Sequence, residues 1–461
     1  MFSTYEAQLN VQQRMKEAQN MAHAYQLIKQ AKKPEKSNSK NILVYVFLCN
    51  FAILFVGMGL FPLLPLYAAE FGANSALIGI YMAITYISIS MGTMLTGWLS
   101  EHWSRRKTYL SAGLIGIPAL VLLGQASALW QVILLTSVVW FAGGIGLALA
   151  NVYTGLHANK ESRGKAFSLV ALASPVGAVI GGMLVGRVVE WQGYPIMFVM
   201  TAVVWSLWPV VALLKLKEDP AVKAVKKTSG TAVLRENSDN VFVLILLGVL
   251  FSALTISVAR LGLSLTMKAQ LFTPSQISSA TAIGGLVTIP VTLGIGSLSD
   301  RLGRKRFLML SYLVAAIGAL TLGFSHQLWH FWIASSLLLA ARSSNGSIAS
   351  ALATDLLAPE ALGRSLPWVH TMNWVASVIG FAGTGFGIET LGTVGLLLAA
   401  TTASIFAAGM LGLLPAKMGF QAAARKQIIC YLPESERVVT AKTRSRYSNF
   451  CLVRDPVTSQ N

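Results

Sequence analysis

The sequence contains few charged residues and few cysteines. Only 12% of its 461 residues are Asp, Glu, Lys or Arg, whereas soluble domains carry roughly 25%. The three cysteines, Cys49, Cys430 and Cys451, are widely scattered and provide no disulfide framework. Hydrophobic residues make up 54% of the chain, and its mean hydropathy is +0.61. These features exclude a soluble globular domain and a disulfide scaffold, and they indicate a polytopic membrane protein.

The sequence also lacks the motifs of enzymes and of ATP-driven pumps. It contains no G-x-S-x-G, no H-E-x-x-H and no P-loop G-x-x-x-x-G-K-[ST]. No Cys and His residues have the spacing of a metal site. We therefore expect no enzyme, no catalytic residue, no metal and no cofactor. The expected partners are the lipid bilayer, a small-molecule substrate and protons, with no nucleic acid, and we expect a monomer.

The long apolar runs predict twelve transmembrane helices, because each helix needs about 17–25 mostly apolar residues to cross a bilayer. These runs are continuously apolar, which excludes a β-barrel, whose strands alternate polar and apolar residues. The predicted fold is an all-α integral membrane protein with an N-terminal tail (1–40), a six-helix bundle (41–216), a linker (217–240), a second six-helix bundle (241–416) and a C-terminal tail (417–461). The predicted spans are 41–69, 76–100, 108–127, 129–156, 163–189, 194–216, 241–268, 275–298, 307–324, 328–357, 363–388 and 391–415.

Positive charge predicts the orientation of these spans. The formal net charge is +18, and the side that carries both tails and the linker receives 32 of the 36 Lys and Arg residues. The opposite side receives only Arg187 and Lys268. The positive-inside rule therefore places both termini in the cytoplasm. Short outer loops without an N-x-[ST] site fit a bacterial inner membrane.

Two loop segments repeat one pattern at an offset of 199 residues. Residues 97–107 read GWLSEHWSRRK, and residues 296–306 read GSLSDRLGRKR. The second copy resembles the cytoplasmic loop motif of the major facilitator superfamily, G-x-L-x-D-R-x-G-R-[KR], at every defined position. The first copy departs from it at Glu101, His102 and Ser104. The resemblance implies two pseudo-symmetric bundles of six helices each, the major facilitator fold.

The resemblance also implies a conformational latch between the bundles at this loop. Its residues are Gly97, Glu101, Arg105, Arg106, Gly296, Asp300, Arg301, Gly303, Arg304 and Lys305. By analogy with the family, Glu101 should lie near the start of the eleventh span (Gly363, Arg364). Asp300 should lie near the start of the fifth span (Gly164, Lys165), where a carboxylate is stabilised by the helix dipole. The alternative is a simple cluster of cytoplasmic positive charge.

The fifth span resembles, less completely, the glycine-rich motif of antiporters in this superfamily. Its glycines include Gly177, Gly181, Gly182 and Gly186, spaced as two G-x-x-x-G pairs. Ala178 replaces the proline of that motif. The antiporter interpretation favours export, whereas the plain interpretation of these glycines is close helix packing.

The resemblance implies that the first, fourth, seventh and tenth spans line a central cavity. Arg260 lies in the seventh span and Arg342 in the tenth, although an arginine at mid-membrane costs roughly 2.5–3.5 kcal/mol. No acidic residue lies near the middle of any span, so the two cations favour a negatively charged substrate. Ser257 shares a helical face with Arg260, and Asn345 shares one with Arg342. In the alternative, Arg260 extends outward to the membrane surface and Arg342 binds backbone carbonyls.

The eleventh span adds polar residues on one face. Asn373 and Trp374 complete the candidate substrate-binding set, and His370 precedes them by one turn. Histidine titrates near neutral pH, so His370 is the candidate for a coupling proton. The alternative is a packed, hydrogen-bonded histidine. In the first span, Pro62 and Pro65 predict a bend.

Two classes of function fit these observations. The first is a secondary active transporter that moves a small anionic or amphipathic solute by alternating access, with proton-coupled export ahead of uptake of a nutrient or metal chelate. The second is a membrane sensor that keeps the fold without transporting. The incomplete first copy of the loop motif favours the second class slightly.

Overall fold

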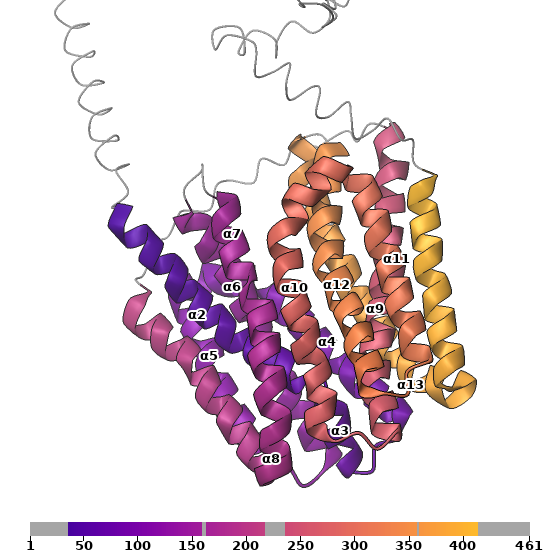
Figure 1. Cartoon of the computed structure of the whole chain (residues 1–461). Coiled ribbons are helices and arrows are strands. Elements are labelled where there is room, and N and C mark those ends of the chain that lie inside the picture. The colour runs from indigo at the N-terminus through magenta and orange to yellow at the C-terminus, as the bar shows by residue number, and fades with distance from the viewer. Residues whose placement is uncertain (1–35, 159–162, 217–235, 357–358, 414–461) are drawn as a thin grey trace, which may run out of the picture.

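The computed structural model describes residues 36–158, 163–216, 236–356 and 359–413, and every element in these ranges is a helix (Figure 1). Within these ranges, nine helical stretches are long and apolar enough to cross a membrane. Two of them, Ala166–Lys215 and Trp368–Gly412, each contain two predicted spans, joined at Gly193 and Gly392. One further helix, α12, has the length of a span but a more polar sequence. The nine stretches cover eleven of the predicted spans, and α12 covers the remaining one by its length.

The helices form two sets, which we call the N-half and the C-half. The N-half comprises α2 (Lys36–Leu60), α3 (Leu64–Glu70), α4 (Ser75–Trp103), α5 (Arg105–Leu123), α6 (Leu129–His157), α7 (Arg163–Ala171) and α8 (Ala173–Lys215). The C-half comprises α9 (Glu236–Ala269), α10 (Pro274–Leu302), α11 (Arg304–Gly323), α12 (Leu328–Leu356) and α13 (Pro359–Gly412). α9 begins inside the predicted linker.

The 199-residue repeat of the loop motif extends through these helices. α4 and α10 begin 199 residues apart, and so do α5 and α11, and α6 and α12. The bends inside α8 and α13 keep the same offset, because Gly193 has φ 77° and Gly392 has φ 68°. Glycine adopts this left-handed region without a steric penalty. The two halves therefore repeat one helical pattern.

The first predicted span is broken near its end. α2 ends at Leu60, a turn covers residues 61–63, and α3 begins at Leu64 with Pro65 in its first turn. A proline there loses no helical hydrogen bond, because the first N–H groups of a helix have no partner within it. The bend predicted from Pro62 and Pro65 is confirmed.

The two halves meet along two seams, α8 against α10 and α4 against α13. We call the end where α4 and α10 finish, at Trp103 and Leu302, the motif end, and the opposite end the far end. The motif end is the upper end in Figure 1. Toward the far end, a Cβ on Gly182 would lie only 2.7 Å from the Ser278 carbonyl oxygen. At the motif end, a Cβ on Gly97 would meet no atom within 4 Å.

Candidate functional site

A cavity of about 90 Å³ lies between the halves near the middle of the helices. Its walls come from α2, α4, α6 and α8 of the N-half and from α9, α12 and α13 of the C-half. Four aromatic side chains contribute to it: Tyr86, Trp140, Trp205 and Trp374. Arg260 and Arg342 also line it, so the structure brings the two predicted cations into one cavity.

Arg260 reaches from the C-half into the N-half. Its side chain is buried, with 9% of the residue exposed. Its guanidinium carbon lies 3.9 Å from the centre of the Phe61 ring, and its Nη1 donates to the Tyr86 hydroxyl at 3.4 Å. A desolvated cation–π contact of this kind contributes about 2 kcal/mol. The contact therefore links α9 to the N-half at the level of the cavity.

An aromatic layer lies beside this arginine and joins the halves. The Tyr86 ring centre is 4.6 Å from that of Phe381 and 5.9 Å from that of Trp374. Phe61 and Phe381 lie 5.7 Å apart. Phe61 and Phe381 are both buried and belong to opposite halves. This layer therefore packs the two halves together beside Arg260.

Arg342 is half-buried on α12 and faces the same cavity. Among the residues that the structure describes, it makes no hydrogen bond and no ion pair. Two guanidinium groups in one low-dielectric cavity repel each other unless an anion lies between them. The predicted alternative, in which Arg342 binds backbone carbonyls, has no such contact in the described ranges.

The described carboxylates are not placed to neutralise these cations. Those whose side chains are described lie at helix ends or just before the bends of α8 and α13: Glu70, Glu190, Asp355 and Glu389. Burial raises the pKa of Glu70, and the positive charge of Lys268 partly offsets this rise. No described residue lining the cavity is acidic. The cavity therefore offers positive charge, aromatic surface and no negative group of its own.

Several predicted substrate-binding residues lie away from the cavity wall. Ser257 is buried, and its hydroxyl donates to the Ser377 hydroxyl at 3.1 Å. Asn373 donates to the Val369 carbonyl of its own helix at 3.0 Å. Asn345 is buried with no partner for its amide among the described residues. Of the six predicted residues, only Arg260, Arg342 and Trp374 line the cavity.

His370 occupies a different environment from the arginines. It is exposed on α13, one helical turn from Trp374 toward the motif end. It does not line the cavity, and no hydrogen bond to it occurs in the described part of the chain. Because residues four apart share a helix face, His370 lies on the Trp374 side of α13.

A second, smaller cavity of about 20 Å³ lies behind Arg260. Ser264 lines it and is buried, and its hydroxyl has no partner among the described residues. Thr281 and Ser335 also line this cavity. This volume accommodates about one water molecule, which would satisfy the serine hydroxyl and part of the guanidinium.

Two basic residues of the loop motif bind carbonyls within their own halves. Arg106 donates to the Leu213 carbonyl at 2.9 Å, and Lys305 donates to the Gly412 carbonyl at 3.2 Å. These two contacts are related by the 199-residue offset, and each places a cation at the C-terminus of a helix, where the dipole favours it. Through these contacts both side chains cap a helix of their own half.

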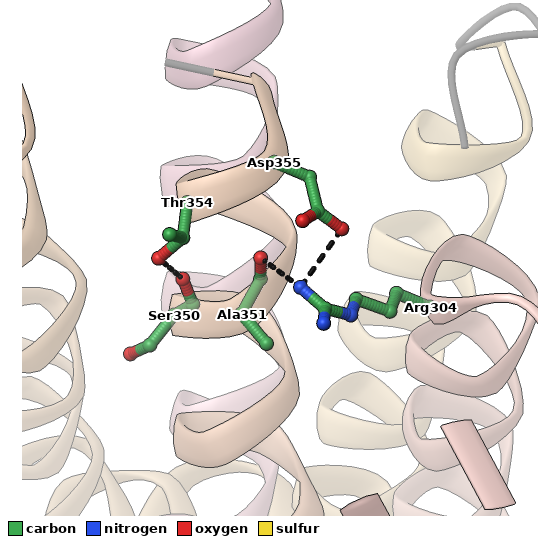
Figure 2. A network of polar contacts seen from close by, with 5 residues as sticks. All are labelled: Arg304, Ser350, Ala351, Thr354 and Asp355. Atoms are coloured by element: carbon green, nitrogen blue, oxygen red, sulfur yellow. Dashed lines mark hydrogen bonds and ion pairs between the residues drawn. The ribbon is translucent and has the colours of Figure 1, made fainter. Parts of the chain in front are cut away.

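Two contacts of Arg304 also lie within the C-half. Figure 2 shows its guanidinium between the Asp355 carboxylate, at 2.8 Å, and the Ala351 carbonyl, at 2.7 Å, which joins α11 to α12. Its counterpart Arg105 is half-buried, and Leu156 stands where the C-half has Asp355. The N-half therefore has no matching ion pair at this position.

Among the remaining latch residues, the structure describes some and leaves others outside the described part. The side chains of Glu101, Gly296 and Asp300, and of their expected partners near Gly164 and Gly363, lie outside the described part. Arg301 is exposed. Gly303 has φ 87°, and Ser104, its counterpart, keeps a positive φ of 72°. The Ser104 hydroxyl also accepts a hydrogen bond from the Lys107 amide at 3.4 Å, so the first copy retains the turn without glycine.

The four glycines of the fifth span lie where helices approach closely. Gly177 and Gly181 lie against α2, where an added Cβ would be 2.8 Å from the Phe55 backbone. Gly182 and Gly186 face the other direction, against Ser278 and its neighbours on α10. One stretch of α8 therefore packs on its own half and on the opposite half at once.

The sequence patterns did not reveal the aromatic residues of the site. Tyr86, Phe61, Trp140 and Trp205 lie in apolar runs, where an aromatic side chain gives no signal of its own. Only the packing of α2, α4, α6 and α8 brings them to one cavity. Arg260 and Arg342 were recognisable because a charge inside an apolar span is costly.

This architecture, two repeated helical halves around a central cavity, defines the class of integral membrane transporters. Residues 46–267 and 245–444 match the Major Facilitator Superfamily. The chain belongs to this superfamily and is a secondary transporter, not an enzyme.

Individual relatives are distant. The chain is 25% identical over 339 residues to the multidrug resistance protein MdtG of Escherichia fergusonii, covering 69% of this chain and 81% of the relative. It is 23% identical over 367 residues to MdtG of Proteus mirabilis, covering 76% and 89%. These proteins are relatives by sequence, and their names describe their own activity.

Solved structures share the fold at low identity. A peptide transporter, POT, in complex with alafosfalin superposes with a TM-score of 0.67 at 13% identity, covering 82% of this chain and 95% of that chain. A bacterial homologue of the human lysosomal transporter Spinster, in an inward-facing and unoccupied conformation, superposes with a TM-score of 0.61 at 15% identity, covering 85% and 98%. The predicted major facilitator fold is confirmed.

Proposed function

We propose that this transporter exports a small amphipathic organic anion by alternating access, driven by protons. The carrying observation is the pair of guanidinium groups, Arg260 and Arg342, in one aromatic cavity without a described acidic residue in its wall. Charge-assisted hydrogen bonds to a carboxylate, sulfonate or phosphate would satisfy Arg342, and the aromatic side chains would hold an apolar body. A cationic cargo would meet repulsion from both arginines.

Export is supported by the relatives and by the charge distribution. MdtG of Escherichia fergusonii and of Proteus mirabilis are named multidrug resistance proteins. The excess of Lys and Arg at the motif end supports a cytoplasmic location for that end and for both termini, in a bacterial inner membrane. With the far end tightly packed, the cargo would enter from the cytoplasm.

His370 is the proposed site of the coupling proton. It lies on the Trp374 side of α13, toward the motif end, and no described carboxylate lines the cavity. A neutral histidine accepts a proton near physiological pH. The variant His370→Gln should lose acceleration by an imposed pH gradient while keeping cargo exchange at equal pH.

The test of the cargo is transport by purified protein in proteoliposomes, with an arylsulfonate and an arylamine of the same size as paired cargoes. We expect the arylsulfonate to be transported, and Arg342→Ala or Arg260→Ala to weaken its apparent affinity about tenfold to hundredfold. Arg342→Lys should recover part of the loss, and Lys107→Ala, an exposed cation at the motif end, should change nothing.

Other outcomes would decide against parts of this proposal. Equal arylsulfonate flux in both arginine variants and wild type would contradict anion recognition. Transport of the arylamine alone would indicate a cationic drug exporter. Accumulation of the anion toward the cytoplasmic side under a proton gradient would indicate an uptake symporter. A purified protein that moves and binds neither cargo would favour the non-transporting sensor.

A further inference from the structure

Two glutamates at the far end each bind the first turn of a helix in the opposite half. Glu190, at the end of the first segment of α8, accepts a hydrogen bond from the Ser275 amide of α10 at 2.9 Å. Glu389, in the corresponding segment of α13, accepts one from the Ala76 amide of α4 at 3.1 Å. The first glutamate belongs to the N-half and the second to the C-half, so the two contacts are reciprocal.

The two contacts are equivalent in detail. Both glutamates and both amides are related by the 199-residue offset of the repeat. In each recipient helix the third amide is already capped from within its own half, because Asn74 accepts from Leu77 and Thr273 accepts from Gln276. The opposite glutamate takes the second amide, which has no partner within a helix.

The helices beside these contacts pack backbone against backbone. A Cβ on Gly385, four residues before Glu389, would collide with the Ser75 carbonyl oxygen. A Cβ on Gly186, four residues before Glu190, would collide with the Ser278 hydroxyl and the Pro274 carbonyl. Each glutamate therefore sits one turn beyond a point of direct backbone contact between halves, so separation of the halves there must break its hydrogen bond.

We propose that Glu190 and Glu389 are gating residues that hold the far end closed, a reciprocal pair that we call the far-end clasp. Each carboxylate combines a charge-assisted hydrogen bond with the favourable end of a helix dipole. When the far end opens, both contacts break and both amides pass to water. The clasp thus stabilises one state of the transport cycle over the other, and it depends on alternating access but not on the identity of the cargo.

The proposed clasp predicts that the two single variants have equal effects and that these effects multiply in the double variant. Removing one carboxylate should lower the ratio of far-end-closed to far-end-open molecules about twofold to fivefold. Because the two contacts are separate and equivalent, the double variant should lower the ratio by about the product of the single effects. Glu→Gln keeps a weaker acceptor, so each glutamine variant should lie between wild type and alanine.

The test measures distances across the far end by double electron–electron resonance on the full chain in lipid nanodiscs. Spin labels at Gln125→Cys and Phe324→Cys report this distance, because both positions are exposed, lie in opposite halves and are related by the repeat. The background replaces the buried Cys49 with alanine and the two tail cysteines with serine. Variants are Glu190→Ala, Glu389→Ala, both glutamine variants and the double alanine.

Two neighbouring variants serve as matched controls. Thr390→Ala and Gln192→Ala change exposed far-end residues that bind nothing in the opposite half among the described residues, so the distance distribution should not change. Equal elution volume and melting temperature establish that each variant is folded. A long-distance population that grows in both alanine variants, and most in the double variant, supports the clasp. Distributions identical to wild type in the double variant, or a change confined to one glutamate, would overturn it.

Discussion

The two ends of this transporter use their charged side chains differently. At the far end, Glu190 and Glu389 bind the helix starts of the opposite half, over seams where backbones touch. At the motif end, the described cations Arg106, Arg304 and Lys305 bind within their own halves. The far-end contacts therefore join the two halves, whereas these three motif-end contacts join helices of one half.

Charged contacts to helix ends thus serve two purposes in one fold: some hold the two halves together, and others stiffen a single half. A carboxylate bound to the N-terminus of a helix in the opposite half loses its hydrogen bond when the halves separate. A cation on the C-terminus of its own half's last helix stiffens that half as it moves. Glu101 and Asp300 of the loop motif are expected to supply the first kind of contact at the motif end, in the state where that end is closed.

The largest effect on closure of the far end should follow from enlarging a glycine at its seam. Gly385→Leu would force α13 away from the Ser75 carbonyl of α4. Overpacking costs about 1–3 kcal/mol, so the closed-to-open ratio at the far end should fall about fivefold to 150-fold. Resonance distances between Gln125→Cys and Phe324→Cys measure the ratio.

The same helix offers the control for this glycine. Gly383 is exposed, and a Cβ there meets no atom within 4 Å. Gly383→Leu should leave the distances at wild-type values. A Gly385→Leu protein with a closed far end would show that the seam tolerates bulk and does not govern closure.

A smaller effect should follow from removing the aromatic ring that the Arg260 guanidinium contacts. Phe61→Leu removes the ring 3.9 Å from its guanidinium and so weakens a link between halves. A cation–π contact worth about 0.5–2 kcal/mol corresponds to a twofold to thirtyfold fall in the far-end closed population ratio. Phe251→Leu, whose ring packs on Phe406 away from the cavity, is the control. No difference between the two variants would exclude Arg260 as a link between halves.

The smallest expected effect concerns an ion pair that the C-half has at the motif end and that the N-half lacks. Asp355→Asn removes the ion pair with Arg304, which is about one-quarter exposed and worth about 0.2–1 kcal/mol. We expect a melting temperature lower by a few degrees at most and unchanged resonance distances. Arg105→Ala in the N-half, where Leu156 replaces the aspartate, should have less effect. A shift in the distances would mean that Arg304 takes part in gating.

Much of the architecture could be predicted from the sequence. The apolar runs predicted the helices because each must satisfy its own backbone in lipid, and the repeated loop predicted two equivalent halves. Arg260 and Arg342 were conspicuous because buried charge is expensive, and the resemblance to the superfamily implied that their spans line one cavity. The proline bend between α2 and α3 followed from Pro62 and Pro65.

The remainder depends on contacts between distant segments. Glu190 and Glu389 resemble ordinary loop glutamates, because their partners are backbone amides, which every sequence has. Ser257, Asn345 and Asn373 share helical faces with functional residues, yet neighbouring helices and local hydrogen bonds turn them from the cavity wall. Helical periodicity predicts a shared face, and tertiary packing decides what that face meets.

Distances measured at both ends of the same protein test alternating access of the two halves most directly. Labels at Trp103→Cys and Leu302→Cys, exposed and related by the repeat, report the motif end; those at Gln125→Cys and Phe324→Cys report the far end. Across cargo, pH and clasp variants, alternating access predicts opposite changes, with a longer far-end distance whenever the motif-end distance shortens. Distances that lengthen together, or a far end that never opens during transport, would contradict it.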